Sequence, residues 1–367
     1  MTTGTEPYVL NIGPQHPSTH GVFRIRVVMD GERIEDIDMI VGYLHRSMEK
    51  LAEERTYTQN IPFTDRTDYL AAMSNNLGYC LAAEQLSGVE VPERASYLRV
   101  IFAELQRIAS HAMANGQLVT DAGAWQTPLL YMFREREKIL DLFEMTCGAR
   151  LTTNYMRIGG VAFEPPDEFY PAVNALIDEL PDRLDEYDEL IVDNEIFIAR
   201  ARGVGVISAE DAINASLSGP MLRASGVPWD LRKADPYCVY DHMEFDIPVT
   251  HGGDSYDRFM VRMEEVRQSV RIIRQALEAL PGGAHKTEIP LALRPEPGEV
   301  YTRVEGPRGE LGFYLVSDGG PAPYRFHIRA PSLINLTLLR EMAVGAALPD
   351  AIVALGSIDI VLGEIDR

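Results

Sequence analysis

Hydrophobic residues recur every three or four positions through most of the middle of the chain, which is the spacing of one face of an α-helix. In the segment 65–86 this spacing is carried by Tyr69, Leu70, Met73, Leu77 and Leu81. The other segments with helical spacing are 93–114, 129–151, 169–201 and 256–280, where 169–201 indicates one or two helices. Segment 93–114 is apolar on more than one side, which is typical of a helix inside a bundle. The pattern predicts a helical core, with Tyr69 on the core-facing stripe of its helix.

Both ends of the chain have strand character instead, with alternating polar and apolar residues. Near the N-terminus the candidate strands are 8–12, 23–29 and 34–40, and Asp30-Gly31 is a turn signal between the last two. After Pro281-Gly282-Gly283, the candidate strands are 299–305, 312–316 and 324–328, with the first two joined by a turn at 306–309. We therefore expect small β elements on either side of the helical core.

The predicted fold class is mainly α with small β elements (α+β). Residues 1–367 are predicted to form a single domain, with a β-rich part at 1–42, a helical core at 43–282, and β elements plus a C-terminal segment at 283–367. A hydrophobic content of 46% is ample for a substantial core. Internal repeats and low-complexity segments are absent from the sequence.

Net charge, hydropathy and cysteine spacing exclude several classes of function. A formal charge of −21 repels nucleic acid and anionic lipid, so nucleic acid is not an expected partner and membrane association must come through partner subunits. No apolar stretch approaches the roughly 20 residues of a membrane-spanning helix, and the N-terminus lacks a signal-peptide pattern, so we expect the chain to stay in the cytoplasm. Cys80, Cys147 and Cys238 form no CxxC pair, which favours buried structural thiols over a metal site.

The segment 11–21, NIGPQHPSTHG, sets His16 and His20 in a loop that its two prolines keep out of helical geometry. A stiff loop between strands can hold an imidazole in one orientation, and histidine exchanges protons near neutral pH. A turn in which both histidines only bond to the backbone is the alternative interpretation.

For the other candidate residues, the evidence of a functional role is weaker when each residue is taken alone. Arginines occur beside aromatic residues or histidines, as in GYLHRSMEK (Arg46) and PFTDRTDYL (Arg66), where they could bind an anion, tune a redox centre, or form ordinary surface ion pairs. Tyr69 offers a hydrogen-bond donor in an apolar wall, although a structural tyrosine is the commoner finding. Asp121, in the predicted loop VTDAGAW between two helices, could orient an imidazole. Nucleotide-binding, nucleophile-elbow and HExxH motifs are absent, so these residues do not by themselves establish an enzyme.

The combination resembles the 49-kDa-type subunit of respiratory complex I, which is a relative of the large subunit of nickel–iron hydrogenases. The resemblance runs nearly end to end, and its motifs are long. They are NIGPQHPSTHG, GYLHRSMEKLAEERTY, PFTDRTDYL, FREREKILDLFE, NYMRIGG, LRASGV, LGFYLVSDGG and LGSIDIVLGEIDR. It implies a hydrogenase large-subunit-like helical bundle.

Hydrogenases of this superfamily bind their metal through two CxxC pairs. Here the matching positions fall around 62–66, without cysteine, and on 359–367, where Val361 and Glu364 stand at the cysteine positions. Valine and glutamate cannot supply the thiolates of a nickel–iron centre, so we expect no metal in the cavity. The resemblance implies that the cavity takes a quinone headgroup instead. His20 and Tyr69 would hydrogen-bond it, Asp121 would pair with His20, and Val361 and Leu362 would line the site.

The resemblance also implies the wider function. The chain would be a peripheral-arm subunit of a proton-pumping NADH:quinone oxidoreductase, active only within the complex, with electrons passing from NADH through FMN and iron–sulfur clusters to quinone. Arg46 and Arg66 would lie near a 4Fe-4S cluster held by a small iron–sulfur subunit, and this chain alone would bind no cofactor. Movement of His20 away from Asp121 would help to start proton pumping.

Further implied partners are a 30-kDa-type subunit and the membrane subunit at the quinone tunnel, which would place the chain on the cytoplasmic side of the cell membrane. Two departures from the family pattern, Thr152 and Ile360, leave NADH and ferredoxin both open as electron donors. A non-catalytic scaffold subunit is the remaining alternative.

Overall fold

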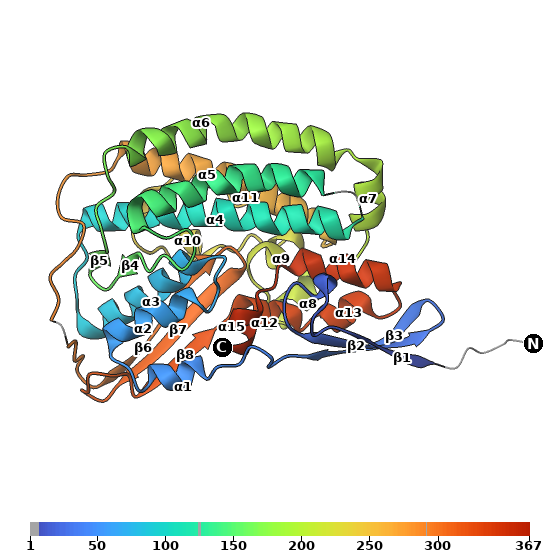
Figure 1. Ribbon diagram of the computed structural model, residues 1–367, viewed down its shortest axis with the longest axis horizontal. Helices are drawn as coiled ribbons and strands as arrows, with labels where there is room; N and C mark the ends of the chain where they lie inside the picture. The colour runs from blue at the N-terminus through green and yellow to red at the C-terminus, as the bar shows by residue number, and fades with distance from the viewer. Residues whose placement is uncertain (1–6, 124–125, 291) are drawn as a thin grey trace, which may run out of the picture.

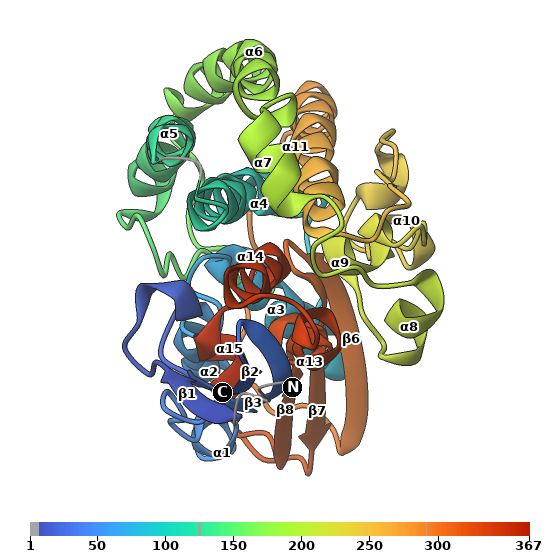
Figure 2. The ribbon, with the colours of Figure 1, turned by 90° about the vertical axis from the view of Figure 1, so that its right-hand side faces the viewer.

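The computed structural model describes residues 7–123, 126–290 and 292–367. A layer of long helices covers one side of the molecule, and two three-stranded antiparallel sheets with short helices form the other (Figures 1 and 2). The mainly α fold with small β elements is confirmed.

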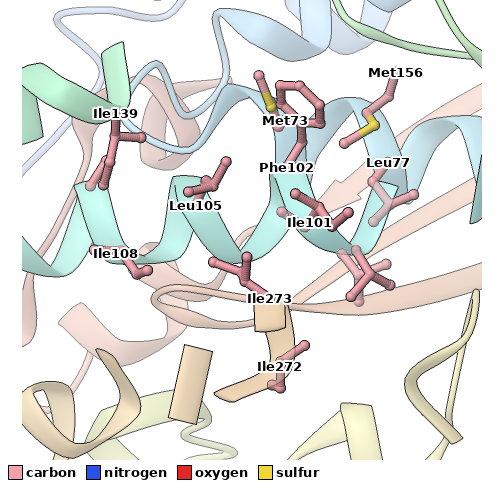
Figure 3. Packing of buried hydrophobic residues seen from close by; sticks show 14 of the residues in the cluster. Met73, Leu77, Ile101, Phe102, Leu105, Ile108, Ile139, Met156, Ile272 and Ile273 are labelled. Carbon is pink, nitrogen blue, oxygen red and sulfur yellow. The ribbon is translucent and has the colours of Figure 1, made fainter. Parts of the chain in front are cut away.

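The helical layer consists of four long helices: α4 (Glu93–Asp121), α5 (Thr127–Cys147), α6 (Phe169–Tyr187) and α11 (Ser255–Glu278). Helix α4 contacts both α5 and α11 extensively, and its side chains are buried on almost every face. Ile101, Phe102 and Leu105 point from α4 into the main hydrophobic cluster, as Figure 3 shows. The all-round apolar pattern of 93–114 thus has the cause predicted from sequence, because α4 lies inside the bundle.

The N-terminal sheet has the order β1-β2-β3, with strands β1 (Tyr8–Ile12), β2 (Arg24–Asp30) and β3 (Arg33–Ile40), so the predicted hairpin is confirmed. Alternate residues of β2, namely Ile25, Val27 and Met29, are buried. They belong to a second hydrophobic cluster shared with the C-terminal helices. This cluster holds the histidine loop, which connects β1 to β2, close to the C-terminal segment.

The C-terminal sheet has the order β6-β7-β8, with strands β6 (Gly298–Gly306), β7 (Gly309–Ser317) and β8 (Arg325–Arg329). It packs against α3 (Ala72–Ser87), where a Cβ at Gly78 would lie 2.9 Å from the ring of Phe313. The predicted strands are confirmed: β6 and β7 are longer than expected, and β8 is shifted by one residue.

Helix boundaries differ from the prediction where polar side chains end or begin a turn. The helix expected at 65–86 begins only at Ala72, as α3, because Asp68 Oδ1 accepts the backbone N–H groups of Leu70 and Ala71 and holds a turn there. This turn separates α3 from α2 (Tyr57–Asp65), a helix that was not predicted. Helix α2 starts with a capping box formed by Thr56 and Gln59, a signal that the periodicity search missed.

Segment 169–201 divides at a π-helical turn, η2 (Asp188–Val192), into α6 and α7 (Glu195–Ala201). The remaining short elements are α1 (Met48–Ala52), β4 (Met156–Arg157), β5 (Gly160–Val161), α8 (Ala209–Asn214), α9 (Gly219–Ala224), α10 (Leu231–Ala234), η3 (Tyr240–His242), α12 (Pro331–Leu336), α13 (Leu339–Ala343), α14 (Leu348–Ile358) and α15 (Leu362–Asp366). The part after residue 330 is therefore helical, and α14 lies against α4.

Candidate functional site

A cavity of about 280 Å³ opens where the histidine loop, the α2–α3 turn, α4 and the end of α14 meet. Its lining residues are Pro17, His20, Tyr69, Leu70, Met113, Ala114, Gln117, Gly356, Asp359, Ile360 and Val361. The walls combine apolar side chains with a few polar groups, which is the usual composition of a small-molecule site. We call this space the junction cavity.

His20 reaches the junction cavity from a short, internally bonded loop. It follows the 3₁₀ turn η1 (Pro17–Thr19), its backbone has a left-handed φ of 55°, and its N–H donates to the carbonyl of Pro17 at 3.2 Å. The hydroxyl of Thr19 donates to the carbonyl of His16 at 2.7 Å, which ties the loop together. His16 itself is exposed, and its Nδ1 accepts the backbone N–H of Ser18. The alternative interpretation, in which the histidine side chain bonds only to the backbone, therefore fits His16 but not His20.

Asp121 faces His20 across this loop. The distance from His20 Nε2 to Asp121 Oδ2 is 2.6 Å, and both side chains are largely buried. The angles are outside the range of a hydrogen bond, so the contact is a close ion-pair geometry without a well-aligned hydrogen bond. Gln117, one turn earlier, donates to Asp121 Oδ1 at 3.3 Å and steadies the carboxylate.

The placement of Asp121 in a loop was wrong, because it is the last residue of α4. The helix continues past residue 114 since Leu118 and Val119 are fully buried and extend its apolar contacts. Ala124 and Trp125, which complete the loop predicted from VTDAGAW, lie outside the described residues.

Tyr69 lines the junction cavity from the α2–α3 turn and not from the core-facing stripe of a helix, so that prediction was also wrong. Its side chain is 36% exposed, whereas a core tyrosine such as Tyr79 is 0% exposed. Partial burial, with the nearby Asp68 carboxylate, raises the pKa of the phenol. The turn aims Tyr69 at open space, and the phenol keeps its proton at neutral pH.

Val361 lines the junction cavity, whereas Leu362 lies behind it. Leu362 is fully buried in the second hydrophobic cluster, and a Cβ at Gly21 would meet its side chain at 3.1 Å. Leu362 therefore supports the histidine loop from beneath.

Arg46 and Arg66 lie together on the surface, where an Arg46 Nη donates to the carbonyl of Arg66 at 3.3 Å. Neither residue lines the junction cavity. Arg66 is the C-cap of α2, next to the buried carboxyl of Asp65, whose pKa burial raises to about 6. This arginine pair presents positive charge to solvent in an acidic protein.

Comparison with known proteins shows to which family the chain belongs. Residues 121–296 and 289–367 match the family described as respiratory-chain NADH dehydrogenase, 49 Kd subunit. The NADH-quinone oxidoreductase D-type subunit of Dehalococcoides mccartyi strain 195 is 59% identical over 367 residues, which is the whole of both chains. The chain belongs to the 49-kDa subunit family. Relatives of the same kind occur in Roseiflexus (54% identical over 99% of both chains) and Clostridium beijerinckii (51% identical over 99% of this chain and 98% of the relative).

Two features of this 49-kDa-type subunit concern cofactors and membranes. Within residues 7–123, 126–290 and 292–367, histidine, cysteine, aspartate and glutamate side chains do not gather into a group of three suited to a metal ion. Among the same residues, no helix combines the length and apolar character needed to span a bilayer.

Burial raises the pKa of the thiols of Cys80, Cys147 and Cys238, that of Cys147 to about 12, which makes them poor nucleophiles and ligands.

Sequence reasoning missed a set of charged residues beside the junction cavity in this 49-kDa-type subunit, of which Asp359 lines the cavity. Arg308, in the turn between β6 and β7, bonds to the carboxylates of Asp68 and Asp359 at 2.6 and 3.1 Å. The sequence held a signal, because Asp359 interrupts an apolar run (SIDIVL) and a charge there needs a partner. Gly356 was also missed, and its part in the site is a close approach to Asp121.

Proposed function

We propose that this chain forms the quinone-headgroup site of a proton-pumping NADH:quinone oxidoreductase, together with a neighbouring iron–sulfur subunit. The observation that carries the proposal is that His20, paired with Asp121, and Tyr69 line one junction cavity whose other walls are mainly apolar. A quinone head is a flat, largely apolar ring with two carbonyl oxygens, so it needs this combination of walls and donors.

The chemistry assigned to the residues follows from their donors and charges. The phenol of Tyr69 and the imidazole of His20 each donate a hydrogen bond to a quinone oxygen. Two-electron reduction puts negative charge on those oxygens, and both donors then supply protons. Asp121 Oδ2 lies 2.6 Å from Nε2 of the imidazole and holds the ring in its orientation. Leu70, Met113 and Val361 provide apolar contacts for the ring.

Electrons reach this site from outside the chain. In the proposal they come from NADH through FMN and iron–sulfur clusters elsewhere in the complex, the last being a 4Fe-4S cluster in the small iron–sulfur subunit. The exposed Arg46 and Arg66 face that subunit and raise the potential around its cluster with fixed positive charge. The relatives carry the name NADH-quinone oxidoreductase, which favours NADH over ferredoxin as the donor to the complex.

The remaining proposed partners are a 30-kDa-type subunit and the membrane subunit that carries the quinone tunnel. Contact with the membrane subunit holds the chain at the cytoplasmic face of the cell membrane as a peripheral protein. Coupling to proton translocation starts with the separation of His20 from Asp121 when the site is reduced.

The test is quinone reduction by the intact complex carrying Tyr69→Phe or His20→Ala, with subunit content measured in parallel. Each variant is expected to lower turnover at least about tenfold, because a positioned proton donor is lost. Tyr324→Phe is the matched control, since Tyr324 is 70% exposed and does not line the junction cavity. Wild-type turnover in fully assembled Tyr69→Phe and His20→Ala complexes would leave the chain a scaffold and would contradict the proposal.

A further inference from the structure

Two fully buried arginines of α11, Arg258 and Arg262, differ from the other buried arginines in their partners. Among the described residues, five further fully buried arginines each pair with a carboxylate at 3.1 Å or less. They are Arg99 with Glu84, Arg107 with Glu104, Arg223 with Glu265, Arg232 with Asp230, and Arg308 with Asp68. Within the same part of the chain, Arg258 and Arg262 donate to neutral groups, and carboxylates attract them only from beyond ion-pair distance. A buried charge without a direct counter-ion is costly, so its neutral acceptors need to be close and well placed.

The acceptor residue that these two arginines share is Ser357, in the last turn of α14. This helix lies against both α4 and α11 (Figure 2). Arg262 Nη2 donates to the backbone carbonyl of Ser357 at 2.6 Å, and Arg258 Nη1 donates to the Ser357 hydroxyl at 2.8 Å. The last carbonyls of a helix have no partner inside the helix and carry partial negative charge, so two guanidinium groups bind this turn firmly.

The guanidinium of Arg258 is fixed from its other side as well. Its Nη2 donates to the carbonyl of Gly205 at 2.6 Å and to that of Gly253 at 2.8 Å, in the segments that precede α8 and α11. Arg262 Nη1 donates to the carbonyl of Arg258 at 3.4 Å, one turn earlier in α11. The end of α14 therefore cannot move away from α11 without leaving buried N–H groups unpaired, which costs free energy.

Ser357 connects the two arginines to the junction cavity through its neighbour Gly356. Gly356 lines the cavity, and its backbone lies against the carboxylate of Asp121 and the imidazole of His20. A displacement of the last turn of α14 therefore changes the spacing of the His20–Asp121 pair. Arg262 does not itself line the cavity, so it acts on the site through α14.

We propose that Arg262 and Arg258 are positioning residues for quinone reduction. They hold the last turn of α14 at the distance from α4 that the His20–Asp121 pair requires, and Ser357 is the contact through which they act. The inference rests on the proposed function, because the pair acts on a quinone headgroup only in that function.

The first test measures kcat and KM for quinone in the intact complex carrying Arg262→Met. Methionine cannot donate to Ser357, so the turn is released and kcat should fall at least about tenfold, because small misplacements of reacting groups have large effects on rate. Arg262→Lys should keep at least about a third of the wild-type kcat, since an ammonium group can still donate to the Ser357 carbonyl. Arg271→Met is the matched control and should keep wild-type kcat, because Arg271 lies on the same helix, is 46% exposed and pairs with Asp246 at the surface.

The second test measures the position of His20 without using activity. Diethyl pyrocarbonate modifies accessible imidazoles, and peptide mass spectrometry of the purified full chain gives the modification rate of each histidine. The side chain of His20 is 12% exposed and its Nε2 is buried against Asp121, so Arg262→Met should raise its rate at least about threefold. His16, exposed in the same loop, and His111, fully buried in α4, should keep their wild-type rates.

A rise at His111 together with His20 would mean that the substitution loosens the whole bundle, and it would overturn the positioning role. Ser357→Ala is the smaller perturbation, because it removes only the hydroxyl that Arg258 contacts. It should raise the rate at His20 about twofold or more, and it decides the matter if Arg262→Met does not fold.

An unchanged rate at His20 with unchanged kcat in Arg262→Met would overturn this inference. If Tyr69→Phe still loses turnover in the same preparation, the proposed quinone site survives that result. If His20 becomes more reactive while turnover stays at the wild-type level, the arginines hold a pair that quinone reduction does not use. That outcome would overturn both this inference and the role proposed for His20.

Discussion

Gly356 lies directly against the carboxylate of Asp121. A Cβ at position 356 would be 2.5 Å from Asp121 Oδ2 and 3.4 Å from His20 Nε2. Helix α14 can therefore pack on α4 beside the His20–Asp121 pair only because residue 356 has no side chain. The close approach of two helices and the geometry of an ion pair depend on the same glycine.

This relationship predicts the effect of Gly356→Ala. Alanine favours a helix over glycine by about 1 kcal/mol, so α14 itself should not be weakened. The added methyl group pushes Asp121 away from His20, and turnover of the intact complex should fall about tenfold or more. Gly282→Ala is the control, because no atom lies within 4 Å of its Cβ position. Equal turnover in the two variants would show that the spacing at Gly356 is not needed for catalysis.

A second prediction concerns the charge of Asp121. Asp121→Asn keeps the size of the side chain and removes the charge that faces His20 at 2.6 Å. Without this charge the imidazole is no longer held beside the cavity, so we expect the barrier to rise by about 1.4 kcal/mol or more, which is at least about a tenfold loss of quinone reduction, with normal assembly. Asp241→Asn serves as the control, since Asp241 and His242 form an exposed pair 3.7 Å apart. Retained activity in Asp121→Asn would mean that the carboxylate only fills space.

A third prediction follows from the raised pKa of Asp65. Burial moves that pKa from about 3.8 to about 6, so the folded chain binds the proton more tightly than the unfolded chain does. The stabilisation is complete below about pH 4 and is lost as pH rises through about 6, with a difference of about 3 kcal/mol. Asp65→Asn cannot ionise and should lack this loss. Urea unfolding of the wild-type and Asp65→Asn chains between pH 4 and 7 measures this loss. If the free energy of unfolding depended on pH in the same way in both chains, the raised pKa of Asp65 would be contradicted.

A fourth prediction tests the core between the long helices. Phe102 is fully buried and stacks on Phe169 with ring centroids 4.9 Å apart and planes at 11°. Phe102→Ala should lower the free energy of unfolding by about 3–5 kcal/mol, because it leaves a cavity among α4, α5 and α6. Phe163→Ala, at a site 56% exposed, should cost less than about 1 kcal/mol. Denaturant unfolding of the purified chain distinguishes them, and similar losses would place Phe102 outside the cooperative core.

The sequence by itself determined the elements whose signals are local. Helical spacing predicted α4, α5 and α11, alternation predicted both sheets, and two prolines predicted the stiff loop that carries His20. These features depend on residues within a few positions of one another, and the hydrophobic period reports them directly.

Tertiary structure alone decided which of these residues meet. Tyr69 fits the apolar period of a helix, yet the side chain of Asp68 holds it in a turn that faces the junction cavity. Arg308 and Asp68 are 240 positions apart in the chain, and no local pattern relates them. Their pairing follows from the packing of the β6–β7 turn, the α2–α3 turn and the C-terminal segment around one buried guanidinium. Spacing along a sequence reports which face of an element is buried, whereas the partner of a buried charge is fixed only when distant elements pack together.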